Sequence, residues 1–371
     1  MGGGNDTIDF VVPWVDGGDP AWQAEKDRHA AEMTDAAGAK WLDGSQRYRD
    51  LGLLRYWFRG VEKFAPWVNK VHFVTWGHLP PWLNTAHPKL HVVRHEDFIP
   101  REYLPTFSSR CIDLNLHRIP GLSERFVYFN DDTFLTAPVK PTDFFRKGLP
   151  CDAAIISPIY LKQNGVRAEI NAMYIINERF RKNEVLKKHP FKWFSPKYGI
   201  ALVRTLTQLP YRLFTGFYVH HGPVSYLKST FDKVWRTEPG ALARACAHRF
   251  RDDSDVNQWI MQYWQYCTGE FCPRSPKFSS MYEHGDVLRE AEADIVKQRR
   301  KSLCWNDSDE TGNLEAIARM SAAFETVLGD PCEYEDLRKV SADARGNRDA
   351  TSVEHEKGQD DETNLGHTSS L

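Results

Sequence analysis

The chain has 371 residues, of which 41% are hydrophobic and 13% aromatic, so it can bury a sizeable core as two average domains or one elaborated α/β domain. Its 48 Lys and Arg residues nearly balance its 50 Asp and Glu residues, and the formal net charge of −2 excludes wholesale nucleic-acid binding through a basic excess. Any anionic ligand must therefore meet local basic groups.

The cysteines and the N-terminal residues predict a cytoplasmic protein. Seven scattered cysteines form no CxxC zinc pattern, which favours reduced, mostly buried thiols. The first 15 residues lack the basic and apolar regions of a signal peptide. No run approaches the ~20 apolar residues of a spanning helix. Peripheral association with the inner face of the membrane stays open.

The first predicted element is a strand in the stretch "TIDFVVPWVDG" at residues 7–17. Its apolar residues are too continuous for a half-exposed strand and suit a sheet covered on both faces. Asp19 and Pro20 then form an N-cap and first helical position for a helix that follows.

The next elements continue an α/β pattern. Asp50 can cap a helix whose apolar residues between 51 and 64 share one face. Residues 70–76 and 89–95 read as short strands, Ser108 can cap another helix, and residues 125–132 form a further strand. This order predicts a mostly parallel, helix-covered sheet.

The second half of the chain is less regular and mainly helical. Helical patterns occupy residues 169–188, 255–266 and 313–328, and an extended segment, a loop and a helix are expected within 216–235. Beyond residue 335 apolar residues nearly vanish, so residues 336–371 are predicted to be a disordered polar tail.

Two adjacent carboxylates follow the strand "RFVYF", in Asn130-Asp131-Asp132. They cannot both be buried and ionised without a cation, and hard oxygen ligands suit magnesium or manganese. The alternative is that one Asp caps the following turn while the other is solvated. Ligands bind beyond the carboxyl ends of strands in open α/β sheets, which makes the two interpretations evenly matched.

Other strand ends supply partners for such a site. The first strand ends in Asp16-Gly17-Gly18, and the second in Thr75-Trp76-Gly77. If the strands are neighbours, these turns line one crevice. The glycine pair permits close approach of a ligand, although a tight turn explains it equally well.

Basic residues suited to phosphate lie near the second helix. Arg47 and Asp50 precede it, at its positive end, and Arg55 and Arg59 share one of its faces. Arginine pairs bidentately with phosphate oxygens. A solvated helix face is at least as good an interpretation for Arg59.

The C-terminal half adds three clusters. His220 and His221 precede Gly-Pro in a loop and offer a general base, although an ordinary structural histidine is the better explanation on sequence grounds alone. The stretch "HRFRDDSDVNQ" carries Arg251, Asp253 and Asp255, and "CWNDSDE" carries Asn306 and Asp307. The Asp residues of both stretches could instead be helix caps.

Taken together, these residues describe a divalent metal, a phosphate-rich ligand and a proton acceptor. That combination favours phosphoryl transfer. No GxGxxG follows the first strand and no GxxxxGK[ST] occurs, so dinucleotide dehydrogenases and P-loop NTPases lose support.

Several blocks resemble the Stealth family of sugar-phosphate transferases. The first block is "DFVVPWVDGGDPAW"; the second runs from "RYRDLGLLRYWFRGVEKF" through "VHFVTWG", "HEDFIP" and "LPTFSS" to "LHRIPGLSERFVYFNDD". "VHHGPVSYLKSTFDKVW" with "FRDDSDVNQ" is similar to the third block, and "KSLCWNDSDE" to the fourth. The resemblance spans most of residues 7–335. The second block is long and specific, whereas the third and fourth are looser.

The resemblance implies a Rossmann-like, GT-A-related α/β fold with helices on both faces of a mostly parallel sheet and helical additions in the C-terminal half. Residues 1–335 would form a single catalytic domain, with a nucleotide-sugar and metal half (7–150) and a helical half that completes the site (151–335). The implied reaction moves sugar-1-phosphate from a UDP-sugar such as UDP-GlcNAc to an acceptor hydroxyl and releases UMP. The family's biology implies capsule or cell-surface polysaccharide synthesis, with Mg²⁺ or Mn²⁺ as cofactor. The acceptor would be a sugar or polysaccharide chain end, and a homodimer stays open.

The family's functional positions carry over to residues of this chain. The sequence then predicts catalytic roles for His221, Asp132 and Arg251; substrate-binding roles for Asp16, Gly17, Arg47, Asp50, Arg55, Thr75 and Asn130; and metal-binding roles for Asp131, Asp132, Asp255, Asn306 and Asp307.

Two positions depart from the family pattern, and two other functions remain in competition. Pro13 replaces a common Thr, and Trp76 replaces a common Asn, which puts the contacts to the donor sugar or base in doubt. A GT-A-type glycosyltransferase would use similar ligands but release UDP. A non-catalytic sugar-nucleotide-binding protein would turn nothing over.

Overall fold

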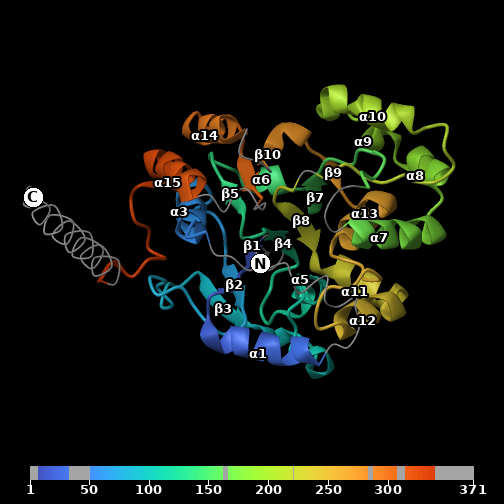
Figure 1. Cartoon of the computed structure of the whole chain (residues 1–371). Coiled ribbons are helices and arrows are strands. Elements are labelled where there is room, and N and C mark those ends of the chain that lie inside the picture. The colour runs from blue at the N-terminus through green and yellow to red at the C-terminus, as the bar shows by residue number, and fades with distance from the viewer. Residues whose placement is uncertain are drawn as a thin grey trace, which may run out of the picture.

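A five-stranded sheet forms the centre of the molecule (Figure 1). The structure is a computed structural model that describes residues 7–32, 51–161, 166–219, 221–282, 287–306 and 314–338. The strand order is β3 (Leu90–Arg94), β2 (Val71–Thr75), β1 (Ile8–Pro13), β4 (Arg125–Tyr128) and β8 (Val224–Leu227).

The first four strands of this sheet are parallel, and only β8 is antiparallel to its neighbour β4. The predicted mostly parallel α/β fold is therefore confirmed. Strand β8 comes from the second half of the chain, so both halves contribute to one sheet.

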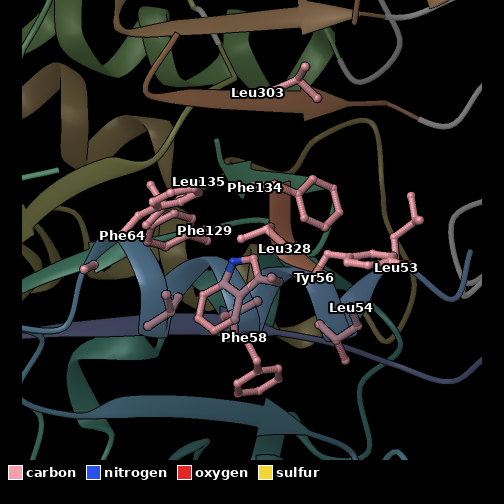
Figure 2. Close-up of a cluster of buried hydrophobic side chains, with 14 of the residues drawn as sticks. Leu53, Leu54, Tyr56, Phe58, Phe64, Phe129, Phe134, Leu135, Leu303 and Leu328 are labelled. Atoms are coloured by element: carbon pink, nitrogen blue, oxygen red, sulfur yellow. The ribbon is translucent and has the colours of Figure 1, made fainter. Parts of the chain in front are cut away.

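Helices cover both faces of the sheet. Successive residues of β1 point to opposite faces, so β1 contributes to a core on each side. Phe10 and Val12 pack with α3 (Leu54–Phe64), α14 (Leu288–Val296) and α15 (Leu314–Leu328) in one core. Figure 2 shows part of this core, where Phe129 and Leu135 lie on one side of helix α3 and the Phe58 ring points away on the other side.

Val11 points into the second core, on the other face of the sheet. The helices of this face are α5 (Ser109–Leu114), α7 (Val166–Arg179), α8 (Lys182–Lys188), α9 (Pro190–Trp193), α11 (Lys228–Thr237), α12 (Pro239–Ala247) and α13 (Trp259–Thr268). Together the two cores account for the near-continuous apolar sequence of β1.

Two small sheets and several short helices complete the fold. One sheet pairs β10 (Ser279–Tyr282), β11 (Ser302–Trp305) and β5 (Thr133–Leu135); the other pairs β6 (Phe145–Arg146), β7 (Leu149–Asp152) and β9 (Cys272–Pro273). The remaining α-helices are α1 (Pro20–Ala31), α4 (His95–Phe98), α6 (Pro141–Phe144) and α10 (Leu202–Thr207). None of the helices that the structure describes is long and apolar enough to cross a bilayer.

Helix boundaries test the predicted caps. Asp19 accepts a hydrogen bond from the Trp22 amide, which confirms the cap of α1. Helix α3 begins later than predicted, with Leu53 at its N-cap, because Gly52 takes a positive φ; Asp50 lies outside the described residues. Ser108 occupies the N-cap of α5, but its hydroxyl makes no capping hydrogen bond.

Three other predictions can be compared with the structure. All seven cysteines are free, and all but the half-buried Cys272 are buried, as expected. The N-cap of α13 is Gln258, so the interpretation of Asp253 or Asp255 as its cap is wrong. Residues 339–371 of the predicted polar tail lie outside the described residues.

Candidate active site at the carboxyl edge of the sheet

The carboxyl ends of β1, β2 and β4 lie at one edge of the central sheet. Strand β1 is the neighbour of both others, with Val11 opposite Tyr128 and Pro13 opposite Val74. The turns after β1 and β4 carry Asp16 and Asn130 to Asp132, and Thr75 is the last residue of β2. The condition for a shared crevice, that these strands are neighbours, is therefore met.

The Asp131-Asp132 turn is tied to the end of the chain's last small strand. Strand β5 follows the turn directly and pairs antiparallel with β11, and the Trp305 amide donates to the Asp132 carbonyl at 2.9 Å. Burial, followed by the nearby Asp132 carboxylate, raises the pKa of the Cys304 thiol. Asn306 comes straight after Trp305, so the fourth block of the sequence lies beside the Asp pair; Asp307 is outside the described residues.

The donor set at this turn fits a hard divalent cation. Asp131 is exposed, and Asp132 and Asn306 are half-buried, so oxygen donors stand at a solvent-accessible edge. Asp132 accepts a hydrogen bond from the Thr133 hydroxyl at 3.1 Å, and a carboxylate can accept several contacts. Magnesium and manganese favour such oxygen donors and retain several waters.

His221 lies on the neighbouring wall of the site. Its carbonyl accepts a hydrogen bond from the Thr133 hydroxyl at 3.4 Å, and its ring stands edge-on to Trp259, with centroids 5.6 Å apart. Its φ of +39° places it in a left-handed turn between β8 and the preceding segment. His221 lines a pocket with these residues: Tyr128, Asn130, Val219, Gly222, Val224, Gln258, Trp259 and Gln262. The structure thus brings His221 to the Asp131-Asp132 turn.

Asn130 is oriented from beneath by two groups that the sequence did not single out. The Tyr128 hydroxyl donates to the Asn130 side-chain oxygen at 2.7 Å. Tyr128 also lies within hydrogen-bonding reach of the buried Asp113, whose pKa burial raises to about 7. A protonated Asp113 can donate to the Tyr128 oxygen, which frees the Tyr128 proton for Asn130. No sequence pattern marked Asp113, because it lies in a short, largely buried helix.

Arg251 provides positive charge beside Asp113. Its guanidinium donates to the Ser109 hydroxyl at 2.6 Å and interacts electrostatically with Asp113. Burial, followed by the nearby Arg251, lowers the pKa of Arg110. Two guanidinium groups therefore lie close together at the first turn of α5, an arrangement suited to an anion.

Asp255 is engaged by the protein itself. Arg110 donates to one carboxylate oxygen at 3.0 Å, and His248 contacts the other at 2.7 Å. The Asp252 amide also donates to this carboxylate, at 2.8 Å, so Asp255 closes the 252–255 loop. These contacts give Asp255 a structural role, and its metal-binding role stays a prediction. His248, Asp252 and Asp255 are close enough together to share an ion, and an acidic cluster of this kind is common without one.

The turn after β1 is organised by Asp16 and a histidine that the sequence analysis missed. The Asp16 amide donates to His78 Nε2 at 2.8 Å, and its carboxylate accepts from the Gly18 amide at 2.8 Å. Burial lowers the pKa of His78, in agreement with a neutral ring that accepts this hydrogen bond. Thr75 is fully buried, and its hydroxyl donates to the His78 carbonyl at 2.7 Å. Asp16 and Thr75 thus hold two adjacent turns together.

The arginines of α3 separate into two environments. Arg55 is half-buried in the first turn, with its guanidinium 5.8 Å from the Trp82 ring, near the carboxyl edge of the sheet. Arg59 is buried against Glu335, so the expectation of a solvated face is wrong for this residue. Arg47 and Asp50 lie outside the described residues.

Trp76, the unusual residue of the second block, faces helix α1. Its indole N–H donates to Glu25 at 3.1 Å, and its ring packs in a small cluster with Trp22 and Phe107. These contacts attach α1 to the turn after β2.

The chain is similar in sequence to several polysaccharide phosphotransferases. Residues 6–31 match conserved region 1 of Stealth proteins, and residues 47–151 match conserved region 2. The capsular polysaccharide phosphotransferase WcwK of Streptococcus pneumoniae is 42% identical over 329 residues, 88% of this chain and 98% of that protein. The receptor polysaccharide phosphotransferase WefC of Streptococcus oralis is 40% identical and is covered to 99%. The exopolysaccharide phosphotransferase cps2G of Lactiplantibacillus plantarum is 38% identical and is covered to 96%.

Solved structures give distant matches. The galactosyltransferase LgtC, in complex with donor and acceptor sugar analogs, has a TM-score of 0.40 at 12% identity and covers 86% of this chain and 95% of its own. Mouse xyloside xylosyltransferase 1 has a TM-score of 0.35 at 12% identity and covers 81% of this chain and 98% of its own.

Proposed function

The chain belongs to the Stealth family, and from that premise we propose that it transfers sugar-1-phosphate from a UDP-sugar, such as UDP-GlcNAc, to an acceptor hydroxyl in capsule or cell-surface polysaccharide synthesis. The observation that carries the proposal is the pairing of β11 with β5, which brings Asn306 beside Asp131 and Asp132, with His221 on the adjacent wall. The proposal includes a fold related to the GT-A glycosyltransferase fold, as the Stealth family implies.

In the proposed reaction the acceptor oxygen forms a bond to the β-phosphorus of the donor. The bond from that phosphorus to the oxygen bridging to the α-phosphate breaks, UMP leaves, and the sugar's anomeric bond stays intact. Phosphoryl transfer depends mainly on positioning and on neutralising charge. The product is a phosphodiester between the sugar and the acceptor.

The chain's residues divide this work. His221 takes the proton of the attacking hydroxyl, and Arg251 lies on the side of the diphosphate. The turns of Asp16 and Thr75 with Arg55 hold the nucleotide end of the donor, together with Arg47 and Asp50. Asn130, oriented by Tyr128, holds the transferred sugar phosphate near His221.

A divalent cation completes the proposed site. Asp131, Asp132 and Asn306 would hold it, with Asp307 and Asp255 as the further ligands expected from the family. Bound there, Mg²⁺ or Mn²⁺ supplies positive charge to the diphosphate as the leaving group departs.

Nucleotide analysis tests the proposed reaction directly. The full chain is incubated with UDP-GlcNAc, a panel of other UDP-sugars, a glycan acceptor and Mg²⁺, and the released nucleotide is identified. We expect UMP and a phosphodiester product detectable by phosphorus NMR. Release of UDP alone would replace the proposal with glycosyl transfer on the same fold.

The Asp132→Asn variant tests the site itself. It removes one carboxylate charge without changing side-chain size, and we expect turnover to fall at least about 100-fold, as for other groups that stabilise transition-state charge. Asp27→Asn, on the exposed surface of α1, is the matched control. Equal turnover in both variants, or full activity after treatment with a chelator, would remove the metal site from the proposal.

A further inference from the structure

The segment around α10 has its amphipathic character reversed. Thr205 and Gln208 point inward and are 0% and 7% exposed, and the Ile156 amide donates to the Thr205 hydroxyl at 3.1 Å. Apolar side chains on the other side point to solvent, with Ile200 84%, Val203 49% and Leu206 46% exposed. A surface helix of a soluble protein normally turns its apolar side chains toward the core and its polar side chains toward water.

These and other exposed apolar side chains come from residues 191–213, and we call them together the α10 patch. Ile200 lies in a 3₁₀ turn at Pro196–Ala201, Val203 and Leu206 are three residues apart on neighbouring positions of one face of α10, and Leu209 follows that helix. The α10 patch comprises Phe191, Ile200, Val203, Leu206, Leu209, Tyr211 and Leu213. Figure 1 places α8, α9 and α10 together at one corner of the molecule.

The α10 patch rests on a well-anchored base. The buried Lys182 amine donates to the Gln208 carbonyl at 2.6 Å and to the Leu209 carbonyl at 3.2 Å. Tyr198 is 2% exposed, and its hydroxyl donates to the Lys192 carbonyl at 2.7 Å. Specific interior contacts therefore hold the apolar side chains outward.

The same segment carries one sign of charge. Residues 185–213 contain no Asp or Glu, and their basic residues are Lys187, Lys188, Lys192, Lys197, Arg204 and Arg212. The whole chain has a formal net charge of −2, so this basic segment is a local feature. Exposed apolar residues interleaved with Lys and Arg are typical of surfaces that lie in the interface of an anionic bilayer.

We propose that the α10 patch docks the protein onto an anionic phospholipid membrane. The apolar side chains would enter the boundary between headgroups and acyl chains, and the surrounding ammonium and guanidinium groups would meet lipid phosphates. A second copy of the chain is the poorer occupant, because a two-fold contact through this patch would bring the two basic segments face to face.

Vesicle co-sedimentation of the full chain tests this docking independently of turnover. We expect binding to phosphatidylcholine vesicles that contain phosphatidylglycerol, weak binding to phosphatidylcholine alone, and release by salt. The variant Val203→Ser/Leu206→Ser removes apolar area, and Lys197→Glu/Arg212→Glu reverses charge. Each should lower binding at least about tenfold.

Matched substitutions elsewhere provide the controls. Leu314→Ser removes a side chain that is 82% exposed outside the patch, and Lys140→Glu reverses an exposed charge elsewhere. Circular dichroism verifies that every variant folds. Binding equal to wild type in both patch variants, no binding to anionic vesicles, or a concentration-dependent dimer abolished by the patch substitutions would overturn the proposal. Lost vesicle binding with unchanged transfer to a soluble acceptor would separate docking from the proposed reaction.

Discussion

Asp113 links a buried carboxyl group to the surface of the candidate site. One route outward runs through Tyr128 to Asn130, a residue that lines the pocket with His221. Burial raises the pKa of Asp113 to about 7. Near neutral pH its carboxyl group therefore exchanges between a neutral form, which can donate a hydrogen bond, and an ionised form, which is poorly solvated. Orientation of Asn130 and stability of the fold therefore depend on the same proton.

This pKa gives a pH-dependent stability with a definite sign. The unfolded carboxyl ionises near pH 3.8 and the folded one near 7, so the Asp113 contribution is fully present below pH 4 and is lost as the pH rises towards 7. The loss is up to about 4 kcal/mol. In Asp113→Asn we expect the melting temperature to decline less between pH 5 and 8 than in wild type, as measured by circular dichroism.

Glu169 supplies the matched variant for this experiment. Burial also raises its pKa to about 7, beside Tyr263 and away from the pocket. Glu169→Gln should flatten the same profile without changing turnover, whereas Asp113→Asn should also change turnover. An unchanged pH profile in Asp113→Asn would show that the carboxyl is already neutral or well solvated.

His221 can be tested as a base without disturbing its turn. Because its φ is +39°, Asn is the non-glycine replacement that tolerates the backbone best. His221→Asn should lower kcat about 10²- to 10⁴-fold while leaving the KM for the donor and the melting temperature nearly unchanged. Retention of wild-type kcat would indicate that another group, such as Asp132, accepts the proton.

Some site residues could be predicted from the sequence and others could not. Asp132 and His221 follow or precede strands, and the sheet brings them together as strand ends do. Asp255 and Arg59 looked similar in sequence, but each is buried against an opposite charge. Such pairings join residues distant along the chain, so local spacing carries no sign of them.

At the level of elements, periodicity predicted most of the fold. Continuous apolar strands and one-sided helices identified β1, β2, β3, β4, α3 and α15. The antiparallel direction of β8 and its place beside β4 depend on the packing of α11 to α13, which no local pattern encodes. The sequence did not reveal the α10 patch, because apolar residues in a sequence are expected to lie in the interior of the protein.

The segment that joins the α10 patch to His221 depends on a single glycine. Gly216 has a φ of +141°, and an added Cβ would lie 2.6 Å from the Ile159 side chain and 2.7 Å from the Ser157 carbonyl oxygen. We expect Gly216→Ala to lower the free energy of unfolding by at least about 2 kcal/mol in urea denaturation. Gly121→Ala has a positive φ but meets no atom within 4 Å, and should cost about 1 kcal/mol. Equal costs would show that the segment shifts readily.

At the level of the molecule, Arg59 joins α3 to the C-terminal residues of the described chain. Its guanidinium pairs with both oxygens of the buried Glu335, at 2.6 and 3.0 Å, and donates to the Leu328 carbonyl at the end of α15 at 2.9 Å. Helix α15 thereby stays on α3, over the core that Figure 2 shows.

Breaking this pair should destabilise the whole fold. Arg59→Met leaves a buried, unpaired Glu335, and we expect a loss of about 3–5 kcal/mol in the free energy of unfolding. Arg94→Met, at an exposed pair with Glu96, should cost less than about 1 kcal/mol. The double variant Arg59→Met/Glu335→Leu should recover most of the loss in denaturant titrations. Equal effects of the two single variants would remove Arg59 as a structural anchor.

The pairing of β11 with β5 also sets when the molecule can become complete during its synthesis. The Asp131-Asp132 turn is translated early. The strand β11, whose Trp305 amide donates to the Asp132 carbonyl, is complete only after residue 305 has been added. Until then, β5 presents an unpaired edge, and the nascent chain has the acidic turn without its neighbour Asn306. Chains released prematurely before residue 302 would therefore carry the central sheet but lack one wall of the site.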